Sequence, residues 1–121
     1  MHTLHTGKSI EENTEQQATI FSALGDPTRL RLVKLLCHQS APDALCVNAL
    51  ATLLNVTQSA VSQHLRVLKS IGLVKGEKRG YYVHYHINRE VLDRCRQLVL
   101  AVLMVQKSET GKQPGNNAIK T

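Results

Sequence analysis

The stretch VNALATLLNVTQSAVSQHLRVLKS, residues 47–70, contains two short helical patterns joined by a three-residue corner. Apolar residues recur at helical spacing in segments 47–54 and 58–70, which predicts two helices that share a small interior. Asn55 tolerates the left-handed conformation that a tight corner between helices requires. Thr57 is placed to cap the second helix. The stretch therefore predicts a helix-turn-helix.

The second of these helices carries a polar face with an informative order. Short donors and acceptors come first and cations come later: Gln58, Ser59, Ser62, Gln63, Arg66 and Lys69. A helix that enters a major groove needs small polar groups near base edges, followed by cations that reach phosphates. The other interpretation is an ordinary amphipathic helix with a solvated face. Only one charge falls between Gln58 and Val67, which is few for a merely solvated face.

Two strand patterns follow the helix pair. Residues 73–77 and 81–87 are predicted to pair around Lys78, Arg79 and Gly80, because glycine permits the turn. A basic-tipped hairpin directly after a helix-turn-helix forms a winged helix. We expect Lys78 and Arg79 to reach the minor groove or the DNA backbone. Alternate side chains of the second strand are expected to pack inward, namely Val83, Tyr85 and Ile87.

Two helical patterns precede this core. Residues 11–24 predict a first helix, which Gly25 ends. Asp26 followed by Pro27 predicts the start of a second helix that runs to about residue 38, because Asp caps free N–H groups and proline suits the first helical position. Residues 39–45 are expected to form a loop.

The last helical pattern begins at Asn88 and runs to about Lys107. Its apolar residues form two adjacent stripes, Val91, Cys95, Leu98, Val102 and Val105 beside Leu92, Val99 and Leu103. A terminal helix has one neighbour of its own to cover such a surface. Leaving three or four large side chains in water forfeits roughly 1.5 to 3 kcal/mol each. The pattern predicts a two-fold homodimer through the first and last helices. The other interpretation is that the first helix alone covers both stripes.

Length and charge agree with a single small domain that meets a polyanion. The chain has 121 residues, and its net charge is +6. Most of the excess lies between Thr57 and Arg89, where Glu77 is the one acid and the bases are Arg66, Lys69, Lys75, Lys78, Arg79 and Arg89. Residues 1–10 and 108–121 are polar and without apolar period, so we expect flexible tails around a domain at 11–107.

Several classes of protein are disfavoured by the composition. No apolar run approaches the ~20 residues that cross a bilayer, and a secretory signal is lacking. We therefore expect a cytoplasmic protein that does not associate with a membrane. Three cysteines do not make a disulfide framework. The sequence has no Gly-rich phosphate loop, nucleophile elbow or His-Glu-x-x-His motif. We therefore expect that the protein is not an enzyme.

Three segments carry a family resemblance: ALGDPTRLRLVKLL (residues 23–36), LCVNALATLLNVTQSAVSQHLRVLKSIGLVK (45–75) and RGYYVHYHI (79–87). Over about residues 21–87 the chain resembles the ArsR/SmtB family of repressors. The resemblance implies an α+β, mostly helical, homodimeric winged helix-turn-helix with a two-stranded wing. It also implies binding to a double-stranded operator, an imperfect inverted repeat, and release by an effector, commonly a metal or metalloid ion.

The helix pattern and the resemblance together give the expected DNA contacts: Thr57, Gln58, Ser59, Ser62, Gln63, His64, Arg66, Lys69, Lys78 and Arg79. The resemblance places base reading at Gln58, Ser59, Ser62 and Gln63. His64 has a second interpretation, as an ordinary partly buried histidine.

The resemblance weakens at both usual effector sites. Members similar to the arsenic, cadmium and lead sensors carry Cys-Val-Cys where this chain has CVN at residues 46–48. A soft-metal site needs two or three thiolates. Members similar to the zinc, cobalt and nickel sensors place ligands where this chain has Arg89, Val91, Val102 and Val105, none of which can ligate.

The cysteines are the remaining effector candidates. Cys37, Cys46 and Cys95 can gather around a thiophilic metal or metalloid ion, with His2 or His5 completing the shell, or a pair can oxidise. The alternative is that Cys37 and Cys95 are small buried hydrophobes. Two further alternatives for the whole chain stay open: a constitutive winged-helix repressor without an effector, and a module for nucleic-acid or protein interaction.

Overall fold

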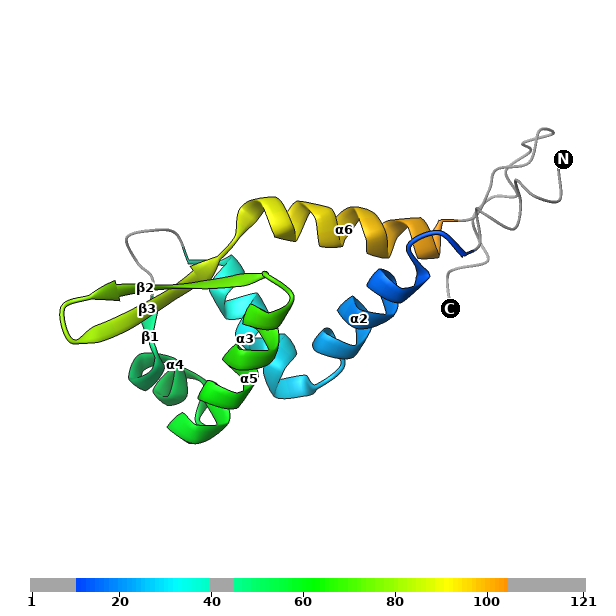
Figure 1. Ribbon diagram of the computed structural model, residues 1–121. Helices are drawn as coiled ribbons and strands as arrows, with labels where there is room; N and C mark the ends of the chain where they lie inside the picture. Colours follow the sequence, from blue (N-terminus) through cyan, green and yellow to red (C-terminus); the bar gives the residue numbers. More distant parts are fainter. Residues whose placement is uncertain (1–10, 40–44, 105–121) are drawn as a thin grey trace, which may run out of the picture.

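The computed structural model describes residues 11–39 and 45–104 and has an α+β, mostly helical architecture (Figure 1). The elements in chain order are α2 (Thr14–Leu24), α3 (Pro27–Cys37), β1 (Leu45–Cys46), α4 (Val47–Leu54), α5 (Gln58–Ser70), β2 (Val74–Arg79), β3 (Tyr82–Ile87) and α6 (Arg89–Leu103). The last helix, predicted to run to about residue 107, ends at Leu103, because Met104 has an extended backbone with ψ 133°. Residues 105–107 and the expected tails at 1–10 and 108–121 lie outside the described residues.

Local capping signals set most helix boundaries. The Asp26 side chain accepts a hydrogen bond from the Arg29 N–H at 2.9 Å, and Pro27 is the first residue of α3, as predicted. The predicted start of the first helix at residue 11 is wrong, since α2 begins at Thr14. Asn13 precedes it with a left-handed backbone, φ 66°, which separates α2 from the residues before it.

The sheet has three strands in the order β1-β3-β2, and all pairs are antiparallel. The prediction that Leu45 ends a loop is wrong: Leu45 pairs with Tyr85, and Cys46 pairs with His84. A two-residue strand is too short to show alternating side chains, so no local pattern predicts the strand or its pairing partner. The rest of that predicted loop, residues 40–44, lies outside the described part of the chain.

The hairpin turn lies later than predicted. β2 extends through Arg79, which pairs with Tyr82, so Gly80 and Tyr81 form a two-residue turn. Gly80 has φ 67°, the left-handed backbone that glycine adopts at little cost. Lys78 and Arg79, which were predicted to lie in the turn, are therefore strand residues, and Arg79 is the one next to the turn. The expected inward packing is also only partly right, because Ile87 is buried whereas Val83 is 38% exposed.

The hydrophobic core lies between α3, α4, α5 and the base of the hairpin. Its largest fully buried side chains come from these four places: Leu32, Leu36, Leu50, Val61, Leu65, Leu68 and Leu73. Because α5 contributes three of them, the helix is anchored along one face and its opposite face is left to solvent. The core therefore fixes which side chains of α5 are available to a partner.

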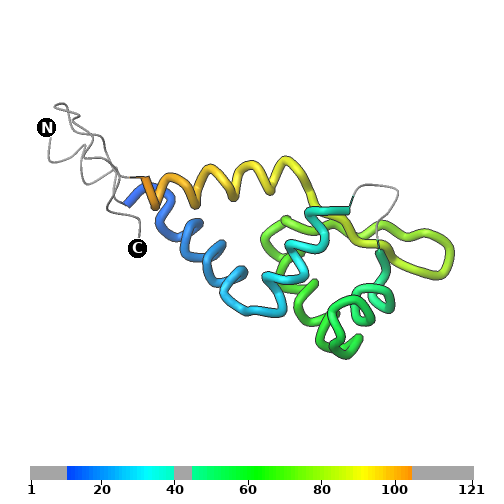
Figure 2. The backbone as a smooth tube through the Cα atoms, turned by 180° about the vertical axis from the view of Figure 1, so that it is seen from behind, coloured from blue at the N-terminus to red at the C-terminus, as the bar shows by residue number. Residues whose placement is uncertain are grey.

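Helices α2 and α6 lie side by side at the end of the molecule away from the hairpin (Figures 1 and 2). The Gln17 side chain donates a hydrogen bond from Nε2 to the Leu98 carbonyl at 3.1 Å. Leu98 is buried, but Val102 is 46% and Leu103 is 66% exposed. The interpretation that the first helix alone covers both stripes of α6 is therefore wrong for this chain by itself. No helix within residues 11–39 or 45–104 has the length and apolar character to cross a membrane.

Candidate nucleic-acid interface

The corner between α4 and α5 has the predicted geometry. Asn55 lies in the left-handed region, with φ 58° and ψ 49°, and its N–H bonds back to the carbonyls that end α4. The Thr57 hydroxyl then accepts a hydrogen bond from the Ala60 N–H at 3.0 Å and caps α5. These two residues fix the angle at which the beginning of α5 projects from the body of the protein.

The exposed face of α5 carries nearly all of the side chains predicted from its pattern. Seven are exposed, with hydroxyls and amides before cations: Thr57, Gln58, Ser59, Ser62, Gln63, Arg66 and Lys69. The first turn of α5 contains no acidic residue. The partial positive charge of a helix N-terminus, together with its free N–H groups, favours an anion there. This face can therefore present donors and acceptors to base edges beside a phosphate backbone.

His64 lies on the inner side of this face. Its side chain is 17% exposed, its Nδ1 lies 3.1 Å from Arg29 Nη1, and its Nε2 lies 3.7 Å from Asp26 Oδ1. These contacts match the interpretation of His64 as a partly buried histidine. The Asp26 carboxylate accepts the Arg29 backbone hydrogen bond, and this bond, with the charge of His64, lowers the pKa of Asp26.

Arg29, on α3, forms hydrogen bonds with both α2 and α5. Its guanidinium donates to the Ala23 carbonyl and, at 3.4 Å, to the Ser22 carbonyl, both at the end of α2. The same group reaches His64 on α5. No local pattern predicts this role of Arg29, because only the cap by Asp26 has a local signal and the contact between Arg29 and His64 spans 35 positions along the chain. Arg29 therefore fixes α5 relative to α2.

The two wing cations differ in environment. Lys78 is exposed, whereas Arg79 is half-buried and its Nη2 lies 3.3 Å from Glu77 Oε1. The Lys69 ammonium lies 5.9 Å from the centroid of the Tyr85 ring, within reach of a cation–π contact, so it connects the end of α5 with the sheet. Exposed cations thus lie on both elements, with Lys69 at the end of α5 and Lys78 on β2.

The three cysteines lie on different elements. Cys37 ends α3 and is half-buried, Cys46 precedes α4, and Cys95 is buried on α6. Burial raises the pKa of Cys37, and Arg89 and Arg96 partly oppose that shift; burial also raises the pKa of Cys95. Within residues 11–39 and 45–104, no three His, Cys, Asp or Glu side chains are grouped closely enough to hold a metal ion. His2 and His5 lie outside the described residues.

One further polar group near a cysteine has no local signal in the sequence. His84 pairs with Cys46 across β1 and β3, and its Nδ1 is buried without a hydrogen-bond partner in the described part of the protein. Buried ring nitrogens are normally hydrogen-bonded. This strand pairing depends on β1, which has no sequence period, so the sequence pattern alone does not predict that His84 and Cys46 are neighbours.

Comparison with known proteins adds the family context. Residues 26–75 match the model of the arsR family of bacterial regulatory proteins. An uncharacterized HTH-type transcriptional regulator, MJ1325 of Methanocaldococcus jannaschii, is 38% identical over 91 residues, which cover 75% of this chain and 96% of that protein. A transcriptional repressor SmtB homolog of Synechocystis sp. is 40% identical over 94 residues, or 71% of this chain and 68% of that protein.

A solved structure agrees with the fold. The homodimeric winged helix-turn-helix DNA-binding domain of Mb0332 from Mycobacterium bovis superposes with a TM-score of 0.56 at 30% identity. The match covers 74% of this chain and 77% of that domain. The similarity therefore extends beyond the helix-turn-helix itself.

Proposed function

This chain belongs to the ArsR family of DNA-binding transcription regulators, and we propose that it acts in the cytoplasm as a homodimeric repressor of its own promoter region. The observation that carries this function is the exposed face of α5, capped by Thr57 and free of acidic residues in its first turn. A helix of this kind fits a major groove, with Gln58, Ser59, Ser62 and Gln63 toward the bases. Arg66, Lys69, Lys78 and Arg79 then contact the backbone.

A second copy of the chain supports this function in two ways. Two-fold symmetry places two α5 helices in successive major grooves, and it covers the apolar end of α6. Leu103 and Met104 are 66% and 71% exposed in the single chain, so their burial against a partner is favourable. The homodimeric state of the Mb0332 domain supports the same arrangement.

A competition binding experiment tests this proposal. The labelled duplex carries the promoter region of the protein's own gene, and the competitors are random duplex and single-stranded RNA. We expect preference for an imperfect inverted repeat whose half-sites lie about one helical turn apart. The affinity should fall steeply with salt, because phosphate contacts release counterions. Equal competition by random duplex or by RNA would favour a general interaction module and refute an operator-specific repressor.

We further propose that a thiol-directed signal, a thiophilic metal ion, metalloid ion or oxidant, releases the dimer from its operator through Cys37, Cys46 or Cys95. Burial raises the pKa of Cys37 and the nearby Arg89 and Arg96 oppose that shift only in part, so the support for this proposal is positional: Cys37 is half-buried, and His84, whose Nδ1 has no hydrogen-bond partner among the described residues, pairs with Cys46 across the sheet. Such an effector must favour the free dimer by about 1 to 3 kcal/mol.

The test of this second proposal is a triple Cys→Ser variant assayed with cadmium, zinc, arsenite and hydrogen peroxide. We expect at least one of these to release the parent from DNA and none to release the variant. Release of the variant by every signal that acts on the parent would refute the thiol mechanism. Release of neither protein would favour a constitutive repressor.

A further inference from the structure

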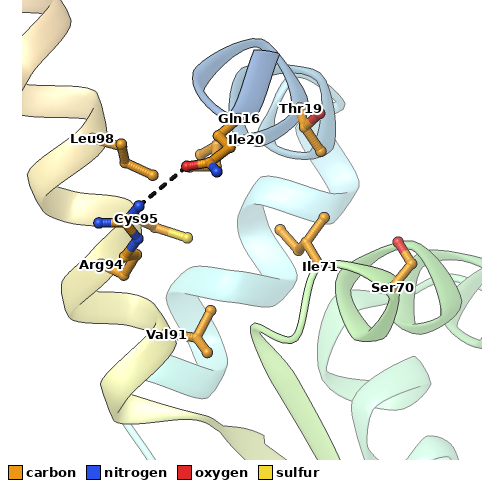
Figure 3. Close-up of a pocket in the computed structure, with 9 residues that line it drawn as sticks. All are labelled: Gln16, Thr19, Ile20, Ser70, Ile71, Val91, Arg94, Cys95 and Leu98. Atoms are coloured by element: carbon orange, nitrogen blue, oxygen red, sulfur yellow. Dashed lines mark hydrogen bonds between the residues drawn. The ribbon is translucent and has the colours of Figure 1, made fainter. Parts of the chain in front are cut away.

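A cavity of about 340 Å³ opens where α2, the end of α5 and the first turns of α6 meet (Figure 3). Its floor and walls are mainly apolar and come from all three places: Ile20, Ile71, Val91, Cys95 and Leu98. Ligand sites in proteins are concave, mostly apolar and equipped with a few polar groups, and this cavity lies at the small end of their usual size range. The lining therefore suits an apolar body of modest size.

The polar groups that line the cavity favour a negatively charged ligand. Arg94 donates a hydrogen bond from Nη2 to Gln16 Oε1 at 3.2 Å, and Figure 3 shows this contact at the side of the cavity. No Asp or Glu side chain lines the cavity. Across the described part of the chain, Arg94 forms no ion pair and its side-chain partner is a neutral amide. A carboxylate would bind this guanidinium more strongly than an amide oxygen does.

The thiol of Cys95 serves as an apolar wall of this cavity. Figure 3 shows the sulfur directed into the space between α6 and Ile71. Burial raises the pKa of Cys95, and the charge of Arg94 opposes that shift only in part. A carboxylate is not an electrophile for a thiol, so a carboxylate ligand beside this wall binds reversibly.

The position of the cavity connects it with both partner surfaces of the protein. Ser70 and Ile71 at the end of α5 form one side, while α2 and α6 form the others. The exposed apolar residues Leu103 and Met104 lie at the far end of α6 and do not line the cavity. An occupant therefore contacts the end of α5 together with α2 and α6, and it leaves Leu103 and Met104 uncovered.

We propose that this cavity binds a small apolar monocarboxylate, whose body lies among Ile20, Ile71 and Val91 and whose carboxylate pairs with Arg94 in place of Gln16. Bound there, the ligand changes the position of α5 relative to α2 and α6, and operator affinity falls. The effect on DNA rests on the proposed repressor function, whereas binding of the carboxylate does not.

The experiment uses 2-naphthoate as the probe and 2-naphthamide as its neutral counterpart, each titrated into the full chain without DNA. We expect 2-naphthoate to bind at least roughly tenfold more tightly, the gain of a charge-assisted pair. Backbone amide NMR shifts should be largest near Ile71 and Val91. Arg94→Gln should abolish the preference. The matched control, Arg96→Gln on the same helix, should keep it, because Arg96 pairs with Asp93 and does not line the cavity.

Two results would overturn the proposal on the free protein. One is an affinity for 2-naphthoate that is equal in the parent and in Arg94→Gln, or absent in both. The other is a set of shifts confined to residues 100–104, which would assign binding to the apolar end of α6. As a second variant, Ser70→Phe fills the cavity from its rim, where Ser70 is exposed, and should weaken binding of both probes.

The consequence for DNA is measured with the promoter duplex. Saturating 2-naphthoate should lower operator affinity at least about fivefold in the parent and in Arg96→Gln, but not in Arg94→Gln. Binding of 2-naphthoate with unchanged operator affinity would refute the effector role. If the parent shows no operator preference even without the probe, the repressor function fails, while the comparison of naphthoate with naphthamide still decides whether the cavity binds carboxylates.

Discussion

Helices α5 and α6 are both amphipathic, but they leave opposite kinds of side chain exposed. α5 buries Val61, Leu65 and Leu68 and exposes hydroxyls, amides and cations. α6 buries Cys95 and Leu98 and exposes a run of apolar residues at its end, Leu100, Val102, Leu103 and Met104. Exposed polar groups gain from a partner with hydrogen-bonding edges and charge, whereas exposed apolar groups gain from exclusion of water.

The difference shows that amphipathic periodicity identifies a helix but not its partner. The partner is indicated by the chemistry of the half that the core leaves uncovered. For α5 that chemistry is complementary to a nucleic acid, and for α6 it is complementary to a copy of the same surface. Substitutions that exchange or remove these side chains should therefore separate DNA recognition from dimer formation.

The largest effect is expected from Leu103→Glu at the apolar end of α6. In a two-fold dimer the substitution occurs twice, and each lost burial costs roughly 1.5 to 3 kcal/mol before the cost of burying the carboxylates. We expect a shift from dimer to monomer in sedimentation equilibrium and a loss of operator affinity of roughly 100-fold or more.

The matched control for that substitution is Gln97→Glu, which adds the same charge on an exposed polar position of the same helix. This variant should remain dimeric and bind the operator like the parent. A dimeric Leu103→Glu protein with full operator affinity would show that the end of α6 is not the dimer surface.

A smaller and more selective effect is expected from Gln63→Ala on α5. If the amide pairs with a base, the variant should lose roughly 1 to 3 kcal/mol of discrimination between the operator and a scrambled duplex. Affinity for the scrambled duplex and the dimer equilibrium should not change. Gln97→Ala on α6 is the control for removal of an exposed glutamine. Equal losses on both duplexes would contradict base reading by Gln63.

Local signals were sufficient to predict the helix-turn-helix itself. The left-handed Asn55, the cap by Thr57 and the cap by Asp26 are confirmed, because each acts through backbone groups within a few positions along the chain. The polar face of α5 is likewise confirmed as exposed, since helical spacing alone determines which residues share it.

The errors concern features that depend on distant parts of the chain. β1 exists because Leu45 and Cys46 find partners on β3, and two residues carry no period. The register between β2 and β3 moves the turn to Gly80 and Tyr81. His64 has the helical position of a surface residue, but Arg29 and Asp26 cover it. Such contacts follow from tertiary packing and not from spacing along one element.

The contact between Arg29 on α3 and His64 on α5 supplies the next test, because it positions α5 without lying on the exposed face of that helix. Arg29→Gln should lower operator affinity about fivefold, the value of one hydrogen bond near 1 kcal/mol. Dimer formation and the dependence of binding on salt should stay as in the parent. Lys34→Gln on the same helix removes one charge from an exposed site and is the control. A salt slope reduced by about one in Arg29→Gln alone would indicate a direct phosphate contact instead.

The smallest effect is expected at the wing, where we propose that cations contact the DNA backbone and do not read bases. Lys78→Gln should weaken operator and scrambled duplex alike and lower the salt slope by about one, the result for a single lost phosphate contact. Arg79→Gln should also act uniformly but more weakly, because its guanidinium already lies 3.3 Å from the Glu77 carboxylate and must leave that partner to bind phosphate. Binding titrations of both duplexes over a range of salt measure these slopes. A change in sequence preference in either variant would assign base recognition to the wing, and the division between a reading helix and a purely electrostatic wing would then be wrong.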